Sequence, residues 1–225
     1  MKVSKLSLVA LLALGMTIPA ALSLAGDDKA KKDDKQAQKD KKDDKKAEGV
    51  AVGSIAPGFE LTDTDGKAIK LSDFAGKIVV LQWFNPGCPF VKKHYEGANT
   101  FNELNKKYSD KGVVFLAINS GAAGKEGAGK DTNATAKKDW KIEYPVLLDE
   151  AGTVGKTYGA TRTPEMYILD KEGKVVYHGA IDDNKDMKGT GKTNYVAKAL
   201  DEVIAGKPVT TAETKAYGCT VKYGK

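Results

Sequence analysis

The 225-residue sequence contains only two cysteines, Cys88 and Cys219, together with two histidines and no Cys-x-x-Cys motif. Zinc and copper sites in proteins are built mainly from clustered cysteine and histidine side chains. With so few of these ligands, a dedicated zinc or copper site is not expected. No metal and no organic cofactor is predicted for this chain.

The sequence also lacks an apolar run of about 20 residues, which is the length that a helix needs to cross a bilayer. A shorter apolar stretch, residues 6–14, follows two lysines and precedes the small residues Ser23-Leu24-Ala25. This order is typical of a secretory signal peptide. We therefore expect residues 1–25 to be a signal peptide, either cleaved near Ala25 or retained as an anchor. The protein is expected in the periplasm or outside the cell, with no integral membrane span after cleavage.

Large apolar side chains are absent from residues 27–48, which contain nine lysines and eight acidic residues. Such a segment buries too little apolar surface to offset the entropy lost on ordering, so residues 26–49 are predicted to be a disordered charged linker. Its charges nearly cancel, which argues against binding to an anionic membrane. The remaining chain divides into a predicted folded domain, residues 50–208, and a C-terminal tail, residues 209–225, that carries Cys219.

The formal net charge is +6 and the pI is near 9.0, but the basic residues are spread along the chain. No recognised nucleic-acid-binding motif accompanies them. A nucleic-acid partner is therefore not expected, because such partners are recognised by clustered basic residues within known motifs.

The most informative stretch of the sequence is IVVLQWFNPGCPFVKKHY, residues 78–95. Its β-branched start predicts a buried strand, Asn85-Pro86-Gly87 predicts a turn, and the apolar spacing after Cys88 predicts a helix. The first N–H groups of a helix and its macrodipole stabilise a nearby anion. Helix N-termini accordingly lower the pKa of cysteine, and the thiolate is the nucleophilic form. Cys88 is therefore a candidate nucleophile.

The other segments predict an α/β domain. A β-hairpin is expected around the Asp63–Gly66 turn, a kinked helix after Cys88 and a buried strand over residues 113–118. Short helices are expected over 133–140 and 153–158, and a strand hairpin after Thr163-Pro164. Residues 194–204 have the apolar spacing of a final amphipathic helix.

With Cys88 after the first long strand and Thr163-Pro164 before the third, this order of elements resembles the thioredoxin-like fold. In particular, the sequence resembles the redoxin branch related to alkyl hydroperoxide reductase and thiol-specific antioxidant proteins (AhpC/TSA). The resemblance implies an α/β fold, with a central mixed β-sheet flanked by helices and an N-terminal β-hairpin. It covers about residues 52–206, and residues 214–219 resemble an ending seen in exported members.

The resemblance also implies roles for individual residues. Cys88 would be the attacking thiol and Pro164 a cis-proline facing it, since X-Pro bonds are the only ones in which cis is common. The Thr163 backbone would then turn toward the sulfur and hydrogen-bond an extended thiol substrate. Pro164 can also be read as an ordinary proline at the start of a strand. The remaining candidate substrate-binding residues surround Cys88, namely Trp83, Asn85, Pro86 and Pro89.

Two departures from the family patterns leave the reaction open. Val91 occupies the place of the second cysteine of a thioredoxin, so Cys88 has no local disulfide partner. The peroxiredoxin pattern Pro-x-x-x-Thr-x-x-Cys is not met, because Leu81 and Asn85 stand at the proline and threonine positions. Disulfide exchange and peroxide reduction therefore both remain candidate activities.

Arg162 is the only arginine among 36 basic residues and lies two residues before Pro164. Its permanently charged fork of donors suits it to hold a thiolate or a peroxide oxygen at Cys88. The alternative is a surface ion pair with Glu165 or another acid. His94 is interpreted as a surface residue rather than a catalytic base, and His178 receives no role.

Cys219 would act as the resolving thiol if the tail brings it to an oxidised Cys88, since a thiolate can attack either a mixed disulfide or a sulfenic acid. The leading hypothesis is an exported thiol-dependent oxidoreductase, with protein thiols or a peroxide as substrate. Cys219 or an outside thiol would resolve Cys88, and a thioredoxin-like or other thiol donor would reduce the enzyme. The alternative is a non-catalytic binding module stapled by a Cys88–Cys219 disulfide.

Overall fold

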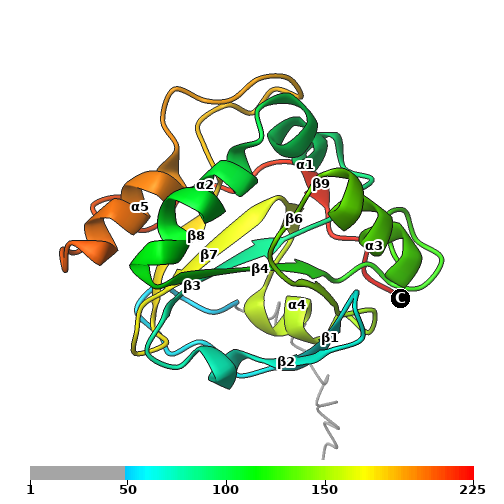
Figure 1. Ribbon diagram of the computed structural model, residues 1–225, viewed down its shortest axis with the longest axis horizontal. Coiled ribbons are helices and arrows are strands. Elements are labelled where there is room, and N and C mark those ends of the chain that lie inside the picture. Colours follow the sequence, from blue (N-terminus) through cyan, green and yellow to red (C-terminus); the bar gives the residue numbers. More distant parts are fainter. Residues whose placement is uncertain (1–48) are drawn as a thin grey trace, which may run out of the picture. The chain divides into compact units, whose positions relative to one another are not determined.

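The computed structural model describes residues 49–225, so the predicted signal peptide and nearly all of the predicted linker lie outside the described residues. A seven-stranded mixed sheet in the order β2-β1-β5-β4-β3-β7-β8 forms the centre of the domain, with helices on both faces (Figure 1). The predicted α/β fold with a central mixed sheet is therefore confirmed. No helix within residues 49–225 has the length and apolar character needed to cross a membrane.

The predicted N-terminal hairpin is present as β1 (Glu60–Asp63) and β2 (Ala68–Lys70). Its turn is closed by Asp63, whose Oδ1 accepts hydrogen bonds from the backbone N–H groups of Asp65 at 2.9 Å and Lys67 at 2.8 Å. Strand β1 pairs antiparallel with β5 (Val146–Leu148), which attaches the hairpin to the sheet.

The centre of the sheet is β3 (Ile78–Trp83), all of whose residues are buried. It runs parallel to β4 (Val113–Asn119) and antiparallel to β7 (Glu165–Leu169), which forms a hairpin with β8 (Val175–Gly179). Successive side chains of a strand point to opposite faces, so β3 contributes to two cores. One lies under α1, α2, α3 and α5, and the other under α4 and the N-terminal segment.

The helix after Cys88 is interrupted, as predicted from its Gly97 and Asn99. It consists of α1 (Pro89–Lys92), a wider π-helical turn (Lys93–Gly97) and, after Asn99 in the left-handed conformation, α2 (Thr100–Tyr108). The other helices are α3 (Lys130–Asp139), α4 (Thr153–Tyr158) and α5 (Tyr195–Ile204). Helix α3 begins earlier than the predicted Asn133, and the predicted bounds of α4 are confirmed.

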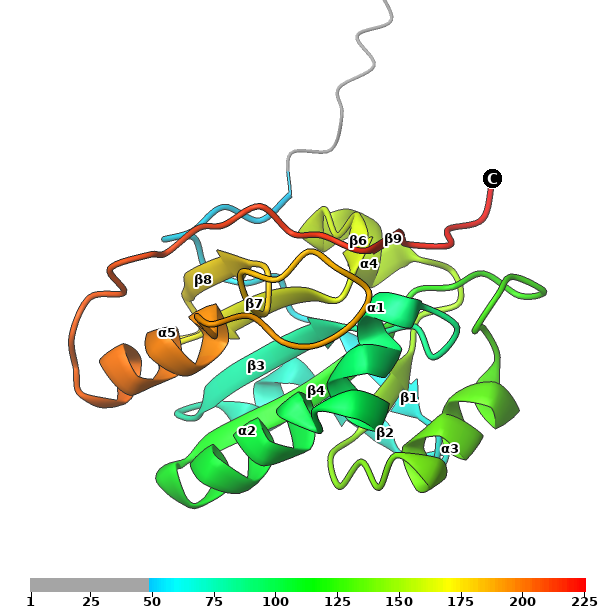
Figure 2. The same cartoon turned by 90° about the horizontal axis from the view of Figure 1, so that it is seen from above.

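The C-terminal residues 209–225, which we call the C-terminal strap, run from the end of α5 across β8 toward β6 (Figure 2). Thr214 N donates to His178 O at 3.0 Å, which fixes the strap on β8. Further on, β9 (Cys219–Thr220) pairs antiparallel with β6 (Arg162–Thr163). The segment predicted as a polar tail is therefore packed on the domain over most of its length.

A buried polar network anchors the strap two residues before Cys219. The Tyr217 hydroxyl donates to Asp182 Oδ1 at 2.5 Å and lies 3.2 Å from His94 Nε2. His94 Nδ1 lies 3.1 Å from Thr100 Oγ1. These distances fit the neutral tautomer in which Nε2–H donates to Tyr217 and Nδ1 accepts from Thr100, an assignment made from the hydrogen-bond network. The network therefore joins the strap to the helix that follows Cys88.

The interpretation of His94 as a surface residue is wrong. Its side chain is 0% exposed, because Tyr217 of the strap covers the side of the helix on which it lies. A residue more than 120 positions away in the sequence thus determines its environment.

We expect His94 to make the stability of the domain pH-dependent. Burial lowers its pKa from 6.5 to about 4, with nearby Asp182 opposing and Lys93 adding to the effect. Between these values the unfolded chain binds more protons than the folded one. The free energy of unfolding should therefore fall by up to about 3 kcal/mol as the pH drops from 6.5 to 4.

Urea unfolding measured at several pH values between 7 and 4 tests this expectation. Replacing His94 by glutamine removes the titrating group, so the variant should lose this part of the pH dependence while its carboxylates still titrate. Parallel curves for the wild type and His94→Gln would show that the pKa of His94 is not lowered in the folded state.

Candidate functional site

Cys88 lies at the N-cap of α1, where its carbonyl oxygen accepts hydrogen bonds from Val91 N and Lys92 N, each at 3.0 Å. The preceding turn is closed by Asn85, whose Oδ1 accepts from Gly87 N at 2.7 Å and whose carbonyl oxygen accepts from Cys88 N at 3.0 Å. The strand, turn and helix around the cysteine are those predicted from the sequence. The side chain of Cys88 is only 1% exposed.

The Thr163-Pro164 segment faces Cys88 from the other side of the site. The peptide bond between these two residues is cis, which confirms the prediction made for Pro164. Cys88 Sγ–H donates to the backbone oxygen of Thr163 at 3.1 Å. The predicted contact between the Thr163 backbone and the sulfur is therefore present, and it joins residues that are 75 positions apart in the chain.

The second cysteine lies beside the first. Strand β9 places Cys219 opposite Thr163 in the antiparallel register, and Thr163 is also the residue whose backbone oxygen accepts from Cys88 Sγ, so the two cysteines are neighbours on the same backbone. Both cysteines are free thiols in this structure. Burial, followed by the contact with Cys88, raises the pKa of Cys219 from 9.0 to about 12. Reduced Cys219 is thus held as a protonated thiol next to Cys88 at neutral pH.

Two charged side chains act on Cys219 with opposite effects on its pKa. Lys222 favours the thiolate and Glu126 disfavours it, and the two form an ion pair with Nζ and Oε2 3.7 Å apart. Glu126 belongs to residues 121–129, a loop that covers the turn before Cys88. A Cβ atom on Gly127 would lie only 1.8 Å from Asn85 Oδ1, so only glycine allows this close approach.

Glu165 is a buried acid that sequence reasoning missed as part of the site. It is 3% exposed, and its Oε2 accepts from the backbone N–H groups of Thr161 at 2.7 Å and Arg162 at 2.8 Å. Its Oε1 lies 2.7 Å from His178 Nε2. Glu165 therefore holds β6 in place and gives His178 a structural contact. The sequence feature that could have revealed this role is an ionisable residue at the start of an otherwise apolar strand, where charged side chains are rare.

Arg162 occupies β6, but its guanidinium makes no ion pair or hydrogen bond within residues 49–225. The alternative ion pair with Glu165 is not formed, because that carboxylate bonds the Arg162 backbone and His178 instead. A role for the guanidinium at the Cys88 sulfur stays a prediction.

The predicted substrate-binding residues around Cys88 differ in their positions. Pro89 is exposed next to the cysteine, whereas Asn85 and Pro86 are buried within the turn. Trp83 lies in the second core, where its Nε1–H donates to Ser120 Oγ at 3.1 Å and its ring packs on Tyr158. The side chains of Asn85 and Trp83 therefore make hydrogen bonds within the domain, and their predicted roles in substrate binding stay predictions.

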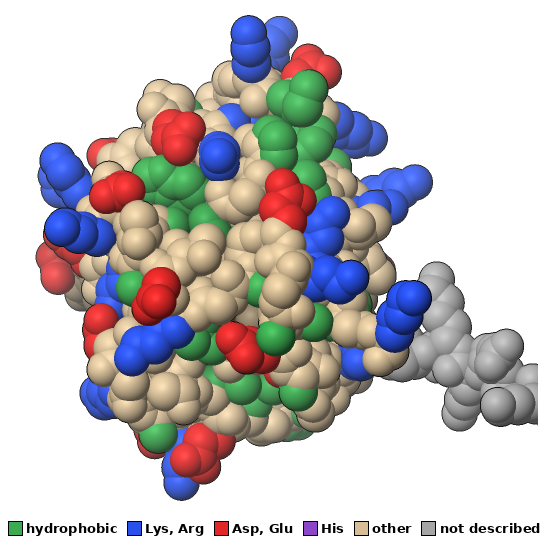
Figure 3. Space-filling view, turned by 90° about the vertical axis from the view of Figure 1, so that its right-hand side faces the viewer, with side chains coloured by type: hydrophobic (Ala, Val, Ile, Leu, Met, Phe, Trp, Pro, Cys, Tyr) green, Lys and Arg blue, Asp and Glu red, His purple; other side chains and the backbone are tan. Residues whose placement is uncertain are grey.

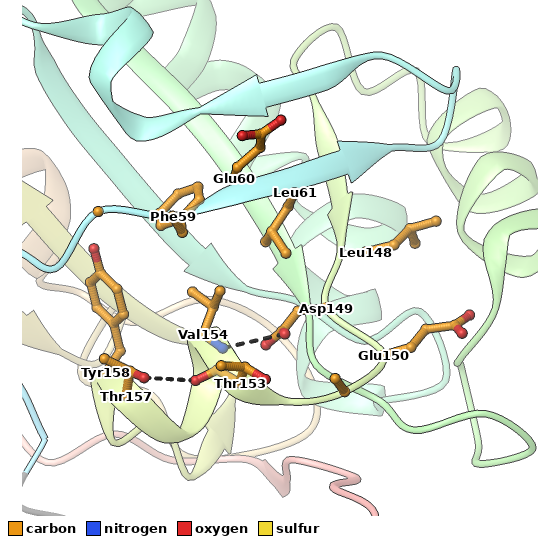
Figure 4. Close-up of a pocket in the computed structure, with 12 residues that line it drawn as sticks. Phe59, Glu60, Leu61, Leu148, Asp149, Glu150, Thr153, Val154, Thr157 and Tyr158 are labelled. Atoms are coloured by element: carbon orange, nitrogen blue, oxygen red, sulfur yellow. Dashed lines mark hydrogen bonds between the residues drawn. The ribbon is translucent and has the colours of Figure 1, made fainter.

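A cleft of about 420 Å³ opens between β1 and α4 (Figure 4). Phe59, Leu61 and Tyr158 contribute apolar surface to it, and Glu60 and Glu150 contribute charge. Asp149 in its wall is already bonded to Ser120 Oγ and to the first N–H groups of α4. Since neither cysteine lines this cleft, it is separate from the thiol site.

On the side of the domain shown in Figure 3, no large area carries charges of one sign only. Lysine or arginine side chains and acidic side chains are interspersed there, with small apolar areas between them. This agrees with the even spread of basic residues along the sequence.

Replacing Glu165 by glutamine should destabilise the domain by about 1–3 kcal/mol, because a buried charged acceptor of several hydrogen bonds is lost. Urea unfolding at pH 7 measures this change. The matched control is Glu172→Gln, an exposed acid in the β7–β8 turn, for which a change within about 0.5 kcal/mol is expected. Equal effects of the two substitutions would show that Glu165 does not hold β6.

Comparison with known proteins shows relatives of most of the domain. The Redoxin family model matches residues 51–196. The thiol-disulfide oxidoreductase ResA of Bacillus thuringiensis subsp. konkukian is 34% identical over 134 residues, which are 58% of this chain and 70% of that protein.

Two solved structures are similar over most of their length. An uncharacterized conserved protein from Geobacillus kaustophilus has 32% sequence identity and a TM-score of 0.72, with 79% of this chain and 94% of that chain covered. A hypothetical protein from Sinorhizobium meliloti has 30% identity and a TM-score of 0.69, with 78% and 96% covered.

Proposed function

The chain belongs to the redoxin family, and from this premise we propose that it is a thiol-disulfide oxidoreductase that uses Cys88 as the attacking sulfur and Cys219 as the resolving sulfur. The observation that carries the proposal is the position of Cys219, which lies opposite Thr163 in the β6–β9 pairing while Thr163 O accepts from Cys88 Sγ. Cys219 of the strap takes the role of the second cysteine of a Cys-x-x-Cys motif, whose place is occupied here by Val91.

The reaction proceeds by two thiol exchanges. The Cys88 thiolate attacks a substrate disulfide and forms a mixed disulfide, while the first substrate sulfur leaves as a thiolate and takes up a proton. The Cys219 thiolate then attacks the Cys88 sulfur, which closes a Cys88–Cys219 disulfide and releases the second substrate thiol. Two electrons have passed to the substrate, and an outside dithiol, such as a thioredoxin-like donor, returns the enzyme to the reduced form.

The pKa of Cys219 supports this order of steps. In the reduced enzyme burial, followed by the interaction with Cys88, raises the pKa of Cys219, so its thiol is protonated at neutral pH. Once Cys88 is part of a mixed disulfide, it no longer presents a thiol to Cys219. Its contribution to the raised pKa of Cys219 is then lost. Lys222 continues to favour the thiolate. Cys219 therefore becomes easier to deprotonate at the step that requires it.

Disulfide exchange is preferred over peroxide reduction for two reasons. Related proteins such as ResA are named for the former. The positions that hold proline and threonine in the peroxiredoxin pattern are occupied here by Leu81 and Asn85. Export of the enzyme to an oxidising compartment, as residues 1–25 predict, fits a thiol-dependent activity on other proteins.

The roles of the two cysteines are tested by a single turnover with oxidised glutathione, followed by mass spectrometry. Wild type should end as an intramolecular disulfide that has lost two hydrogens. Cys219→Ser should stop as a mixed disulfide with glutathione on Cys88, and Cys88→Ser should form neither product and lose turnover.

Two other outcomes would contradict the proposal. Wild-type turnover by Cys219→Ser would mean that an outside thiol resolves Cys88. A Cys88–Cys219 bond that forms on purification and resists a strong dithiol reductant would support the alternative of a structural disulfide in a binding module.

A further inference from the structure

The helical turn that follows α1 buries a charged residue. This π-helical turn places three consecutive side chains, those of Lys93, His94 and Tyr95, in the interior. A regular helix rotates successive side chains by about 100°, so such a run needs cover on more than one side. Lys93 is only 6% exposed, although lysine is almost never deeply buried unless its charge is paired. The burial of Lys93 therefore requires acceptors around its ammonium group.

Those acceptors come from residues 180–194, the β8–α5 loop, which reaches over α1 (Figures 1 and 2). Lys93 Nζ donates to Asn184 O and to Asp186 O, each at 2.8 Å. The same nitrogen lies 4.9 Å from the ring centre of Tyr217 in the strap. Lys93 thus joins three segments of the chain, namely its own helical turn, the β8–α5 loop and the strap.

The β8–α5 loop in turn holds the strap. Asp182 of the loop accepts the Tyr217 hydroxyl at Oδ1, and its Oδ2 accepts from Gly191 N at 2.7 Å within the loop. Tyr217 lies two residues before Cys219 in the strap. The position of the Cys219 sulfur therefore depends on a loop that the Lys93 ammonium fixes in place.

We propose that Lys93 is a positioning residue for the resolving step, because it fixes the β8–α5 loop and Tyr217 and through them holds Cys219 beside Cys88. This inference rests on the proposed function. The hydrogen bonds of Lys93 go to loop carbonyls, so it acts on the effective concentration of the Cys219 thiol rather than on the exchange reaction itself. A strap that is ordered in the reduced protein loses less conformational entropy when the disulfide closes.

The effective concentration is measured by equilibrating the full chain with glutathione buffers of different ratios at pH 7 without oxygen. Acid quenching and mass spectrometry then give the fraction of chains that carry the Cys88–Cys219 disulfide. In this reaction oxidised glutathione takes two electrons from the two thiols, and two molecules of reduced glutathione are released. The equilibrium constant therefore has the unit of a concentration.

Lys93→Met approximates the shape of the lysine side chain and removes its ammonium group. The substitution should lower the effective concentration about tenfold, which corresponds to about 1.4 kcal/mol and raises the reduction potential of this two-electron couple by about 30 mV. The matched control is Lys107→Met, which removes a lysine nitrogen 4.6 Å from the ring centre of Tyr108 and should leave the value unchanged. Circular dichroism checks folding, and Lys93→Gln, which keeps a hydrogen-bond donor, takes the place of Lys93→Met if that variant is unfolded.

A double-variant cycle tests the path through Tyr217. Tyr217→Phe removes the hydroxyl that bonds Asp182 and should lower the effective concentration in the same direction. Because the two side chains act on one path, the combined Lys93→Met/Tyr217→Phe variant should lose less than the product of the two separate fold-changes. Effects that multiply would show that Lys93 does not act through Tyr217, and would overturn the proposal.

Two further outcomes separate this proposal from the proposed function. If the folded Lys93 variant has the effective concentration of the wild type, the positioning role is overturned, while the reversible wild-type disulfide leaves the proposed function intact. If the wild type forms no Cys88–Cys219 disulfide in any glutathione buffer, the proposed function fails and the positioning role fails with it.

Discussion

Strand β9 can lie on β6 only because the backbone at Gly218 comes closer to Thr163 O than a side chain would allow. Both thiols depend on this contact. Thr163 O accepts from Cys88 Sγ on one side, and the Thr163 backbone pairs opposite Cys219 on the other. The two sulfurs are therefore brought together by backbone geometry. Burial at this junction in turn raises the pKa of Cys219.

Two buried polar clusters hold the two strands of this junction. Glu165 bonds the backbone of β6, and Tyr217 ties the strap to Asp182 and His94. Burying such groups is unfavourable unless they are hydrogen-bonded, and here their partners come from distant segments of the chain. The same interactions that position the thiols therefore also close the site.

The strand, turn and helix around Cys88 were predictable because their signals are local. Continuous β-branched residues, Asn-Pro-Gly and apolar helical spacing each act over a few residues, and the interruption at Gly97 and Asn99 follows from low helix propensity. His94 was misplaced for the opposite reason. Its place six residues after Cys88, which on a helix turns it away from the first turn, suggested solvent, whereas Tyr217 from the strap contacts it in the interior. Glu165 was missed because its partners, the N–H groups of β6 and His178, become neighbours only through the sheet.

The sequence by itself determined the α/β fold, the place of Cys88 at the start of a helix and the proline of the facing segment, since each depends on short-range backbone preferences and on hydrophobic patterning. Only the tertiary structure decided that Cys219, 131 residues later, lies against Cys88. Backbone pairing carries no signature in the side chains of a two-residue strand. The position of such a strand depends on the edge left free by the rest of the sheet and on the anchors that hold it there.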